Sequence, residues 1–267
     1  MTAAPSPLLI ETEHPGYVIL TLNQAERRNP LSEAMLDALH AALTRISARS
    51  DLRAVILNAT GTVFCAGHDL KEMSAHRTDA DRGRAYFETL LKRCAALMQA
   101  ILALPQPVIA AVEGVATAAG CQLVATCDLA VAGDEARFAT PGVHIGLFCS
   151  TPMVALSRAV SRKHAMEMLL LGDMVTANEA LRIGLVNRVV PQGEALAAAE
   201  VMARAIAAKS SLTLAIGKRA FYEQIEMTRE DAYLHASHVM VENMLARDAE
   251  EGINAFLEKR DPLWSGT

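Results

Sequence analysis

Hydrophobic residues follow two different patterns along this chain. In the first part, short apolar runs stand between turn residues. One run places Val18, Leu20 and Leu22 on one face, as in a half-buried strand, whereas the run at 108–112 is apolar throughout, as in a buried strand. From Ser161 onward, helical spacing continues with little interruption. The pattern therefore predicts an α/β part followed by a mainly helical part.

Turn and capping signals set the expected boundaries of the elements. Ser32 is expected to cap a helix, because apolar residues follow it at helical spacing. Strands are expected at 8–13, 17–22, 53–59, 108–112, 128–132, 136–138 and 185–190. Further helices are expected at 85–104, 152–160, 162–171, 176–183, 192–209, 211–226, 229–244 and 247–259, with another opening at 118–120. The residues 140–151 are expected to form a loop.

Two stretches each combine a strand, a turn of small residues and the start of a helix. The first turn is Ala66-Gly67 and the second is Ala118-Ala119-Gly120. Small residues let another backbone or a ligand approach closely, and the free N–H groups at a helix start stabilise an anion. Two such turns can place two N–H groups around one oxygen, as in an oxyanion hole. Tight packing of a helix on a strand is the alternative explanation of each turn taken alone.

The combination resembles the crotonase superfamily, the enoyl-CoA hydratase/isomerase family. The resemblance is carried by Phe64-Cys-Ala-Gly-His-Asp-Leu70, Pro107-Val-Ile-Ala-Ala-Val-Glu-Gly114, Ala119-Gly-Cys-Gln-Leu123, Cys127-Asp128 and Glu251-Gly-Ile-Asn-Ala-Phe-Leu-Glu-Lys-Arg260. It covers the chain from about Leu9 to Trp264. It implies an α/β fold, a spiral of repeated ββα turns over residues 1–195, followed by a helical trimerisation region over residues 196–267.

The same resemblance implies a site for an acyl-CoA thioester, with no cofactor beyond the CoA moiety of the substrate and no metal. The N–H groups of Ala66 and Ala119 are expected to form the oxyanion hole. The residues expected to contact CoA are Arg27, Arg28, Ala66, His68, Asp69, Leu70, Lys71 and Gly120. Simpler explanations stay open for some of them: a solvated loop for the two arginines, a helix cap for Asp69 and an ordinary surface position for Lys71.

The sequence departs from the family at the two positions where hydratases carry catalytic glutamates. These positions hold Gln122 and Gly142. Glutamine can position a water molecule but cannot accept a proton at neutral pH, and glycine has no side chain to do either. Both are nevertheless expected to be catalytic positions, with Gly142 offering a void for water or an anion. His144, Cys149 and Ser150 are possible substitutes, each with a structural role as the alternative.

The run from Phe138 to Pro152 also resembles a subgroup called enoyl-CoA hydratase domain-containing protein 3, which shares these departures. Hydration by the two-glutamate route is therefore doubtful for this chain. The alternatives are different thioester chemistry on the same fold, such as isomerase or lyase activity, and acyl-CoA binding without catalysis. A serine hydrolase is not supported, because no Gly-x-Ser-x-Gly motif is present.

Composition limits the classes of molecule that this chain is expected to bind. The 267 residues are 52% hydrophobic with a net charge of −5 and no basic stripe, which argues against nucleic-acid binding. The five cysteines lack metal-ligand spacing and are expected to be reduced thiols. No apolar run predicts a membrane span. Residues 1–7 lack the pattern of a signal or transit peptide, so a cytoplasmic location is expected. The expected partners are an acyl-CoA thioester and further copies of this chain, as a homotrimer and possibly a dimer of trimers.

Overall fold

A computed structural model describes residues 6–267. A six-stranded sheet has the order β1 (Leu9–His14), β2 (Tyr17–Leu22), β3 (Ala54–Ala59), β5 (Val108–Val112), β7 (Leu129–Gly133) and β10 (Arg188–Val190). A four-stranded sheet has the order β4 (Val63–Cys65), β6 (Val115–Thr117), β8 (Arg137–Ala139) and β9 (Val175–Thr176). The antiparallel pairs are β1–β2 and β8–β9, whereas the other neighbours are parallel.

The two sheets are built by a repeating unit. The successive strand pairs β3–β4, β5–β6 and β7–β8 each give their first strand to the six-stranded sheet and their second to the four-stranded sheet. The expected spiral of strand–strand–helix turns is therefore confirmed. The short strands β4, β6 and β9 are not among the expected elements, whereas the equally short β8 lies close to the strand expected at 136–138.

Helices cover both faces of the six-stranded sheet. The side chains of Val108, Ala110 and Val112 in β5 face the main core, while Ile109 and Ala111 face helix α8. This two-sided burial explains why the run is apolar throughout. The helices up to this point are α1 (Glu33–Ser47), α2 (Leu70–Ala75), α3 (Arg84–Ala103), α4 (Ala119–Thr126), α5 (Pro152–Ala159), α6 (Arg162–Leu171), α7 (Ala177–Ile183) and α8 (Ala195–Ala207).

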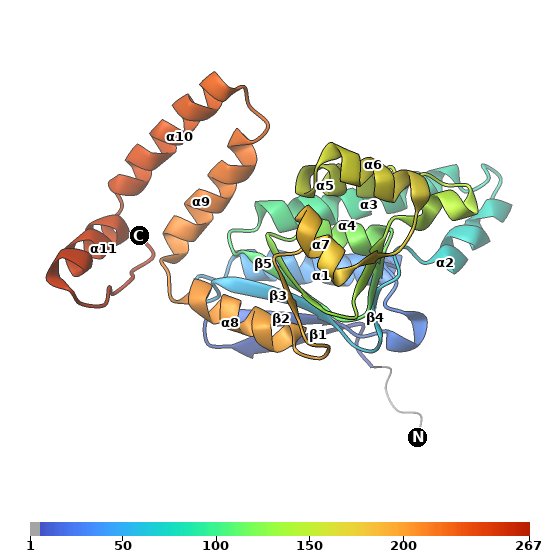
Figure 1. Cartoon of the computed structure of the whole chain (residues 1–267), viewed down its shortest axis with the longest axis horizontal. Coiled ribbons are helices and arrows are strands. Elements are labelled where there is room, and N and C mark those ends of the chain that lie inside the picture. The colour runs from blue at the N-terminus through green and yellow to red at the C-terminus, as the bar shows by residue number, and fades with distance from the viewer. Residues whose placement is uncertain (1–5) are drawn as a thin grey trace.

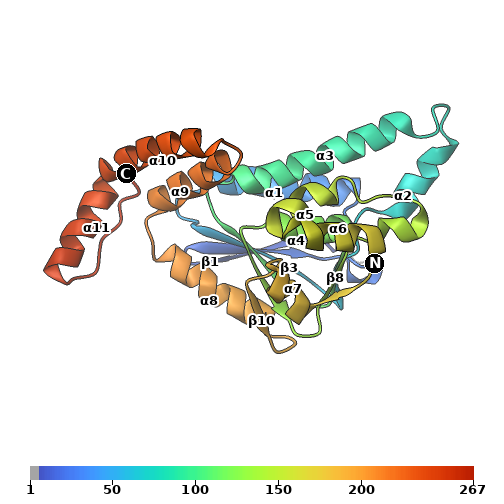
Figure 2. The same cartoon turned by 45° about the horizontal axis from the view of Figure 1, so that its top comes forward.

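The last three helices extend away from this core, as Figures 1 and 2 show: α9 (Ser211–Gln224), α10 (Arg229–Met244) and α11 (Arg247–Glu258). Because α8 packs on the sheet, its contacts group it with the core rather than with α9–α11. We therefore favour a division after α8, and the expected division at residue 195 stays a prediction. In the described residues, no helix is long and apolar enough to cross a membrane.

Local boundaries agree with the sequence analysis where a capping side chain sets them. The Ser32 hydroxyl accepts a hydrogen bond from the N–H of Met35 and begins α1 as expected. The strand expected at 185–190 is wrong over its first half, because Leu185 and Val186 belong to the turn that ends α7 and only Arg188–Val190 pairs with β7. The segment expected to be a loop at 140–151 contains a short 3-10 helix, Pro141–Ile145.

Candidate active site

The first turn of α4 presents backbone N–H groups without intrahelical partners. The earliest N–H bond of this helix runs from Gln122 to the carbonyl of Ala118, so the N–H of Ala119 precedes the hydrogen-bonded ladder. A Cβ on Gly120 would lie 2.2 Å from the carbonyl oxygen of Cys65. Only glycine fits there, and this close approach brings the start of α4 against the turn that follows β4.

The turn after β4 lies directly against Ala119. Gly67 has a φ of 91°, and a Cβ on it would lie 3.2 Å from the Ala119 nitrogen. The Ala66 N–H donates to the carbonyl of Arg28 at 3.1 Å. The N–H of His68 donates no hydrogen bond to another backbone group among residues 6–267. The turn therefore offers His68 N–H beside Ala119 N–H, while the expected donor Ala66 already has a partner inside the fold.

The His68 side chain is held in one tautomer by its surroundings. Its Nδ1 lies 3.2 Å from the carbonyl oxygen of Leu31, which can only accept, so Nδ1 carries the proton. Its Nε2 is buried and has no partner among the described residues. Burial lowers the pKa of His68, opposed by the bond to Leu31. The ring is therefore neutral near pH 7, with an unprotonated Nε2.

The residues expected to contact CoA lie together, because the loop at 27–31 runs beside residues 66–69. Asp69 caps α2 by accepting from the N–H groups of Lys71 and Glu72, at 2.9 and 3.3 Å. This confirms the capping interpretation. The Asp69 carboxylate also forms an ion pair with Arg27. The side chains of Arg28 and Lys71 are exposed, as is that of Leu70 in the first turn of α2.

Gln122 lies one helical turn beyond Ala119 and is only 5% exposed. Its Oε1 is buried without a hydrogen-bond partner among residues 6–267. Thr140 is fully buried, and its Oγ1 also lacks a partner in this part of the chain. The two come from adjacent segments, because the N–H of Ala118 donates to the carbonyl of Ala139 at 2.9 Å. Thr140 is not among the residues expected from the sequence, because its burial depends on the pairing of β6 with β8.

Gly142 does not provide the void that the sequence analysis considered. A Cβ on this residue would lie 2.8 Å from the carbonyl oxygen of Leu147 and 3.0 Å from Sγ of Cys149. The N–H of Leu147 returns to the carbonyl of Gly142 at 2.9 Å, so the loop folds back over the glycine. The space beside Gly142 is therefore filled by protein.

The three possible substitutes for the glutamates differ in placement. His144 is exposed, and its Nε2 packs 2.8 Å from where a Cβ of Gly172 would stand, at the end of α6. Ser150 is exposed and its hydroxyl donates to the carbonyl of Phe148 at 3.3 Å. Cys149 is buried beside Gly142, and burial raises the pKa of its thiol. None of these side chains supplies a carboxylate.

The described residues contain no cluster of side chains that could hold a metal ion. All five cysteines are free. Burial raises the pKa of the Cys65 and Cys121 thiols to about 12, so both are protonated and unreactive as nucleophiles near pH 7. Their burial fits the expected structural role, and their reduced state stays a prediction.

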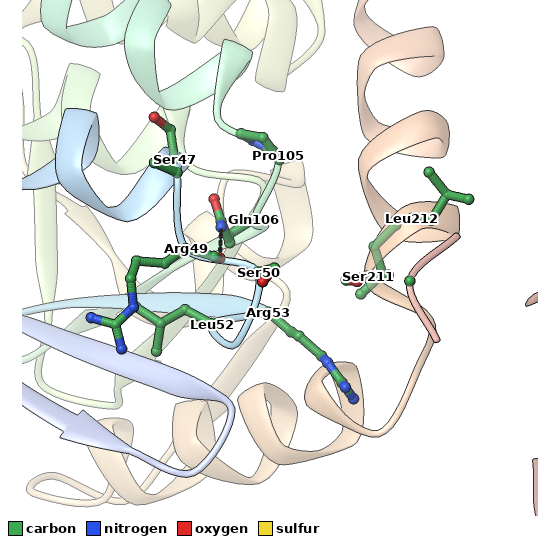
Figure 3. Close-up of a pocket in the computed structure, with 12 residues that line it drawn as sticks. Ser47, Arg49, Ser50, Leu52, Arg53, Pro105, Gln106, Ser211 and Leu212 are labelled. Carbon is green, nitrogen blue, oxygen red and sulfur yellow. Dashed lines mark hydrogen bonds between the residues drawn. The ribbon is translucent and has the colours of Figure 1, made fainter. Parts of the chain in front are cut away.

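A pocket of about 200 Å³ lies apart from the two turns, between the end of α1 and the start of α9 (Figure 3). Its wall includes Arg49, Arg53, Gln106 and Ser211. The Gln106 side chain donates to the carbonyl of Arg49 at 2.9 Å, and Arg53 donates to the carbonyl of Ala207 at 2.6 Å. Both polar side chains are therefore already hydrogen-bonded within the protein, Gln106 inside the core and Arg53 to the end of α8.

The spiral fold with two facing turns defines a protein of the crotonase class. The family model described as enoyl-CoA hydratase/isomerase matches residues 13–267, and the chain belongs to this family. A solved structure titled enoyl-CoA hydratase from Mycobacterium smegmatis is 52% identical, covers 97% of this chain and 99% of its own, and has a TM-score of 0.92. The solved structure of human enoyl-CoA hydratase domain-containing protein 3 is 44% identical over 97% of this chain and 100% of its own, with a TM-score of 0.91.

Curated relatives bear out the resemblance to that subgroup. The mouse enoyl-CoA hydratase domain-containing protein 3 is 46% identical over 260 residues, which cover 97% of this chain and 85% of the relative. The names of the mouse, rat, frog and human relatives place them in mitochondria. This contradicts the cytoplasmic location expected above, and we correct it. That expectation depended on the charge and hydropathy of residues 1–7, of which residues 1–5 lie outside the described part of the chain.

Proposed function

We propose that this chain binds an acyl-CoA thioester and stabilises its enolate through the N–H groups of His68 and Ala119. The observation that carries the proposal is the contact of the two turns, with Gly67 against the Ala119 nitrogen. The positive end of the α4 dipole adds to the stabilisation of a negative oxygen. Removing one such donor from an oxyanion hole typically costs about 10²–10³-fold in rate.

Hydration by a pair of glutamates does not fit this site. Gln122 offers an amide in place of a base, and Gly142 has no side chain. General acid–base catalysis contributes about 10²–10⁴-fold per group, so both losses together remove most of that route. The carbonyl oxygen of Leu147 also stands where a longer side chain at position 142 would begin. The proposed reaction is therefore one in which the site stabilises an enolate and does not activate a water molecule.

The CoA phosphates are assigned to the exposed cations beside the site. The Arg27 guanidinium is already paired with Asp69, which leaves Arg28 and Lys71 as the exposed charges nearest the two turns. Arginine suits a phosphate because its planar fork donates two parallel hydrogen bonds. Arg27 then positions the loop rather than contacting the ligand itself.

Infrared spectroscopy of a bound thioester carbonyl tests the oxyanion hole without assuming a reaction. Butyryl-CoA labelled with carbon-13 at the carbonyl is expected to show a lower stretching frequency when bound, because two N–H donors polarise the bond. Ala119→Pro removes one donor at the first helical position, although the preceding Ala118, with φ 50° and ψ −118°, has to shift to accommodate the proline ring. Its matched control is Arg229→Pro, at the same position of α10.

In this experiment, Ala119→Pro should lose most of the frequency shift, while Arg229→Pro should keep it. Thermal unfolding of both variants checks that they are folded. Tight binding with no frequency shift in the wild type would instead favour the alternative, an acyl-CoA-binding protein without catalysis. Failure to bind butyryl-CoA at all would contradict both.

We further propose that α9–α11 associate with other copies of this chain, as a homotrimer or as a dimer of trimers. The supporting observation is the apolar surface that these helices leave open: Phe221, Tyr233, Leu234, Met240, Val241, Met244, Leu245, Ile253, Phe256 and Leu257. Many large exposed apolar residues on three successive helices are typical of a protein interface. Sedimentation velocity over a range of concentrations measures the association directly.

A further inference from the structure

The pocket between the end of α1 and the start of α9 is a cleft whose two sides come from different regions of the chain. Its volume is about 200 Å³, and none of its lining residues belongs to the two turns of the proposed oxyanion hole. Drug-sized ligands occupy roughly 300–1,000 Å³, so this cleft suits a smaller molecule. Gln106 lies on the core side of the cleft, whereas Ser211 and Leu212 lie on the α9 side (Figure 3).

The core side offers a hydrogen-bond acceptor without a partner. Gln106 is 5% exposed, and its Oε1 has no partner among residues 6–267. The orientation of the amide is fixed, because Nε2 donates to the carbonyls of Ile46 at 3.0 Å and Arg49 at 2.9 Å, and a carbonyl can only accept. In Figure 3 the free oxygen points between Ser47 and Pro105, which both line the cleft. Because buried polar atoms rarely stay unpaired, this oxygen indicates an absent donor.

The end of α1 adds negative partial charge on the same side. This helix ends at Ser47, so the Ile46 carbonyl belongs to its last turn, where the helix dipole favours a cation. The Arg49 guanidinium does not fill that role, because it forms ion pairs with Glu13 at 2.9 Å and with Asp51 at 2.6 Å. The core side therefore suits an ammonium group, which only donates hydrogen bonds.

The α9 side favours an anion. The N–H groups of Ser211 and Leu212 open a helix of 14 residues and donate to no other backbone group in the part of the chain that the structure describes. Arg53 also lines the cleft and is partly buried. Its Nη1 donates to the carbonyl of Ala207 at 2.6 Å, and its guanidinium has no carboxylate partner within residues 6–267. A carboxylate would satisfy both the guanidinium and the helix start.

A carboxylate of the protein itself does not neutralise this side. Asp248 forms a hydrogen bond with Ser210, which precedes α9, but Asp248 is only 2% exposed. It accepts from the N–H groups of Ser265 at 2.7 Å and Gly266 at 3.0 Å. Its charge is therefore held by the last residues of the chain, and Arg53 stays without a counter-ion among the described residues.

Much of the remaining lining is apolar, including Leu52, Pro105 and Leu214. We propose that the cleft binds a small zwitterion in which an apolar chain separates an ammonium group from a carboxylate, as in an ω-amino acid. The ammonium donates to Oε1 of Gln106 beside the end of α1. The carboxylate accepts from Arg53 and from the start of α9. This inference does not depend on the proposed thioester function.

Such a ligand joins the core to the C-terminal helices. Lys218 of α9 already donates to the backbone carbonyl of Gln106 at 3.1 Å. A ligand held between Gln106 and the start of α9 adds a second connection at the same place. We therefore expect bound ligand to raise the midpoint of thermal unfolding and to slow hydrogen exchange of the N–H groups of Ser211 and Leu212.

The test uses the full chain with 4-aminobutanoate, 6-aminohexanoate and 8-aminooctanoate as probes of different length. Trp264 is the only tryptophan, and it precedes Gly266 of the cleft by two residues. Its Nε1 donates to the carbonyl of Ala208 at 2.8 Å, so its fluorescence should report occupancy of the cleft. Calorimetric titration gives the Kd. Hexanoate and hexylamine each keep one charge and should bind at least about tenfold more weakly than 6-aminohexanoate, as expected for one lost charge-assisted hydrogen bond.

Variants separate the two sides of the cleft. Arg53→Gln should weaken binding of the tightest probe by about tenfold or more, whereas Arg53→Lys keeps the charge and should restore part of the affinity. Gln106→Met removes the acceptor on the core side. Arg188→Gln makes the same change as Arg53→Gln in β10, outside the cleft, and should bind like the wild type. Thermal unfolding checks that each variant is folded, since Gln106→Met also loses two hydrogen bonds to the end of α1.

Three results would overturn the inference. The first is no saturable change in fluorescence or heat with any of the three zwitterions up to about 10 mM. The second is equal affinity for 6-aminohexanoate and for hexanoate or hexylamine, which contradicts recognition of two opposite charges. The third is a folded Arg53→Gln variant with unchanged affinity. If Gln106→Met does not fold, the Arg53 variants and the series of probes still decide the question.

Discussion

The spiral core and the three C-terminal helices bury their hydrophobic residues very differently. Strands of the core such as β5 are buried on both faces. In contrast, α9 and α10 contain no buried hydrophobic residue, and α11 buries only Asp248 and Ala255. The core buries its hydrophobic residues within one chain, whereas the C-terminal helices leave theirs exposed to solvent. We therefore expect the stability of the first region to be a property of one chain, and the stability of the second to depend on the proposed association.

One buried ion pair connects the two regions. The Lys218 ammonium of α9 lies 2.7 Å from Oδ2 of Asp128, which follows α4 directly, and its side chain is only 6% exposed. The ammonium also donates to the carbonyl of Ile101 at the end of α3, at 2.8 Å. Asp128 accepts further bonds from Tyr222 and from the N–H of Val108. Burial lowers the pKa of Lys218, and the charge of Asp128 opposes that shift.

The largest effect is expected from breaking this connection. Lys218→Met leaves Asp128 buried without its cation, which typically destabilises a protein by about 3–5 kcal/mol. Urea unfolding at fixed protein concentration measures the change. Adding Asp128→Asn removes the uncompensated charge and should recover part of the loss. A cost below about 1 kcal/mol for Lys218→Met would show that α9 is held by other contacts.

The next effect tests whether α9–α11 depend on association. Phe256 is 82% exposed in the single chain, and burying such a side chain contributes about 1.5–3 kcal/mol. Phe256→Asp should therefore weaken self-association by at least about tenfold, read by sedimentation velocity. The control Glu230→Gln alters an exposed polar residue of α10 and should leave association unchanged. Equal association of both variants would place the interface elsewhere.

A smaller effect compares two helix caps, one in each region. Ser32 caps α1 in the core, and Thr228 caps α10 by accepting from the N–H of Asp231. Removing a cap typically costs about 1 kcal/mol. Ser32→Ala should lower the unfolding free energy of the whole core, whereas Thr228→Ala should only speed hydrogen exchange near the start of α10. Similar global losses for both would mean that the two regions unfold together.

The smallest effect concerns acid sensitivity of the core. Burial holds the pKa of His68 below its ordinary value of about 6.5, so the unfolded chain takes up the proton first as the pH falls. The neutral ring contributes fully to the free energy of unfolding above about pH 6.5, and this contribution is lost as the pH drops toward the folded-state pKa. His68→Gln should flatten the stability profile between about pH 7 and 5. An unchanged profile would assign the acid sensitivity to other groups.

Several features of the fold were predictable because they are local. The caps at Ser32 and Asp69, and the long amphipathic helices, depend on residues a few positions apart. The donor at the first turn was not predictable, because it depends on a bond from Ala66 to Arg28 across the fold. The filled space at Gly142 likewise depends on a loop that returns from Leu147. The free N–H donor and the filled space at Gly142 both depend on contacts between segments that are distant in sequence. The spacing of residues along the chain does not reveal such contacts.

The parallel ladder of β4 and β6 has a consequence for redesigning this protein. Val63 pairs with Val115 and Cys65 with Ala116, so the two turns are fixed by register rather than by the chain that runs between them. Between the two turns, α2 contains no buried residue, whereas α3 buries Leu90, Cys94, Leu97, Met98 and Ile101 in the main core. The segment around α2 can therefore change in length while both N–H donors stay in place, but α3 has to be kept.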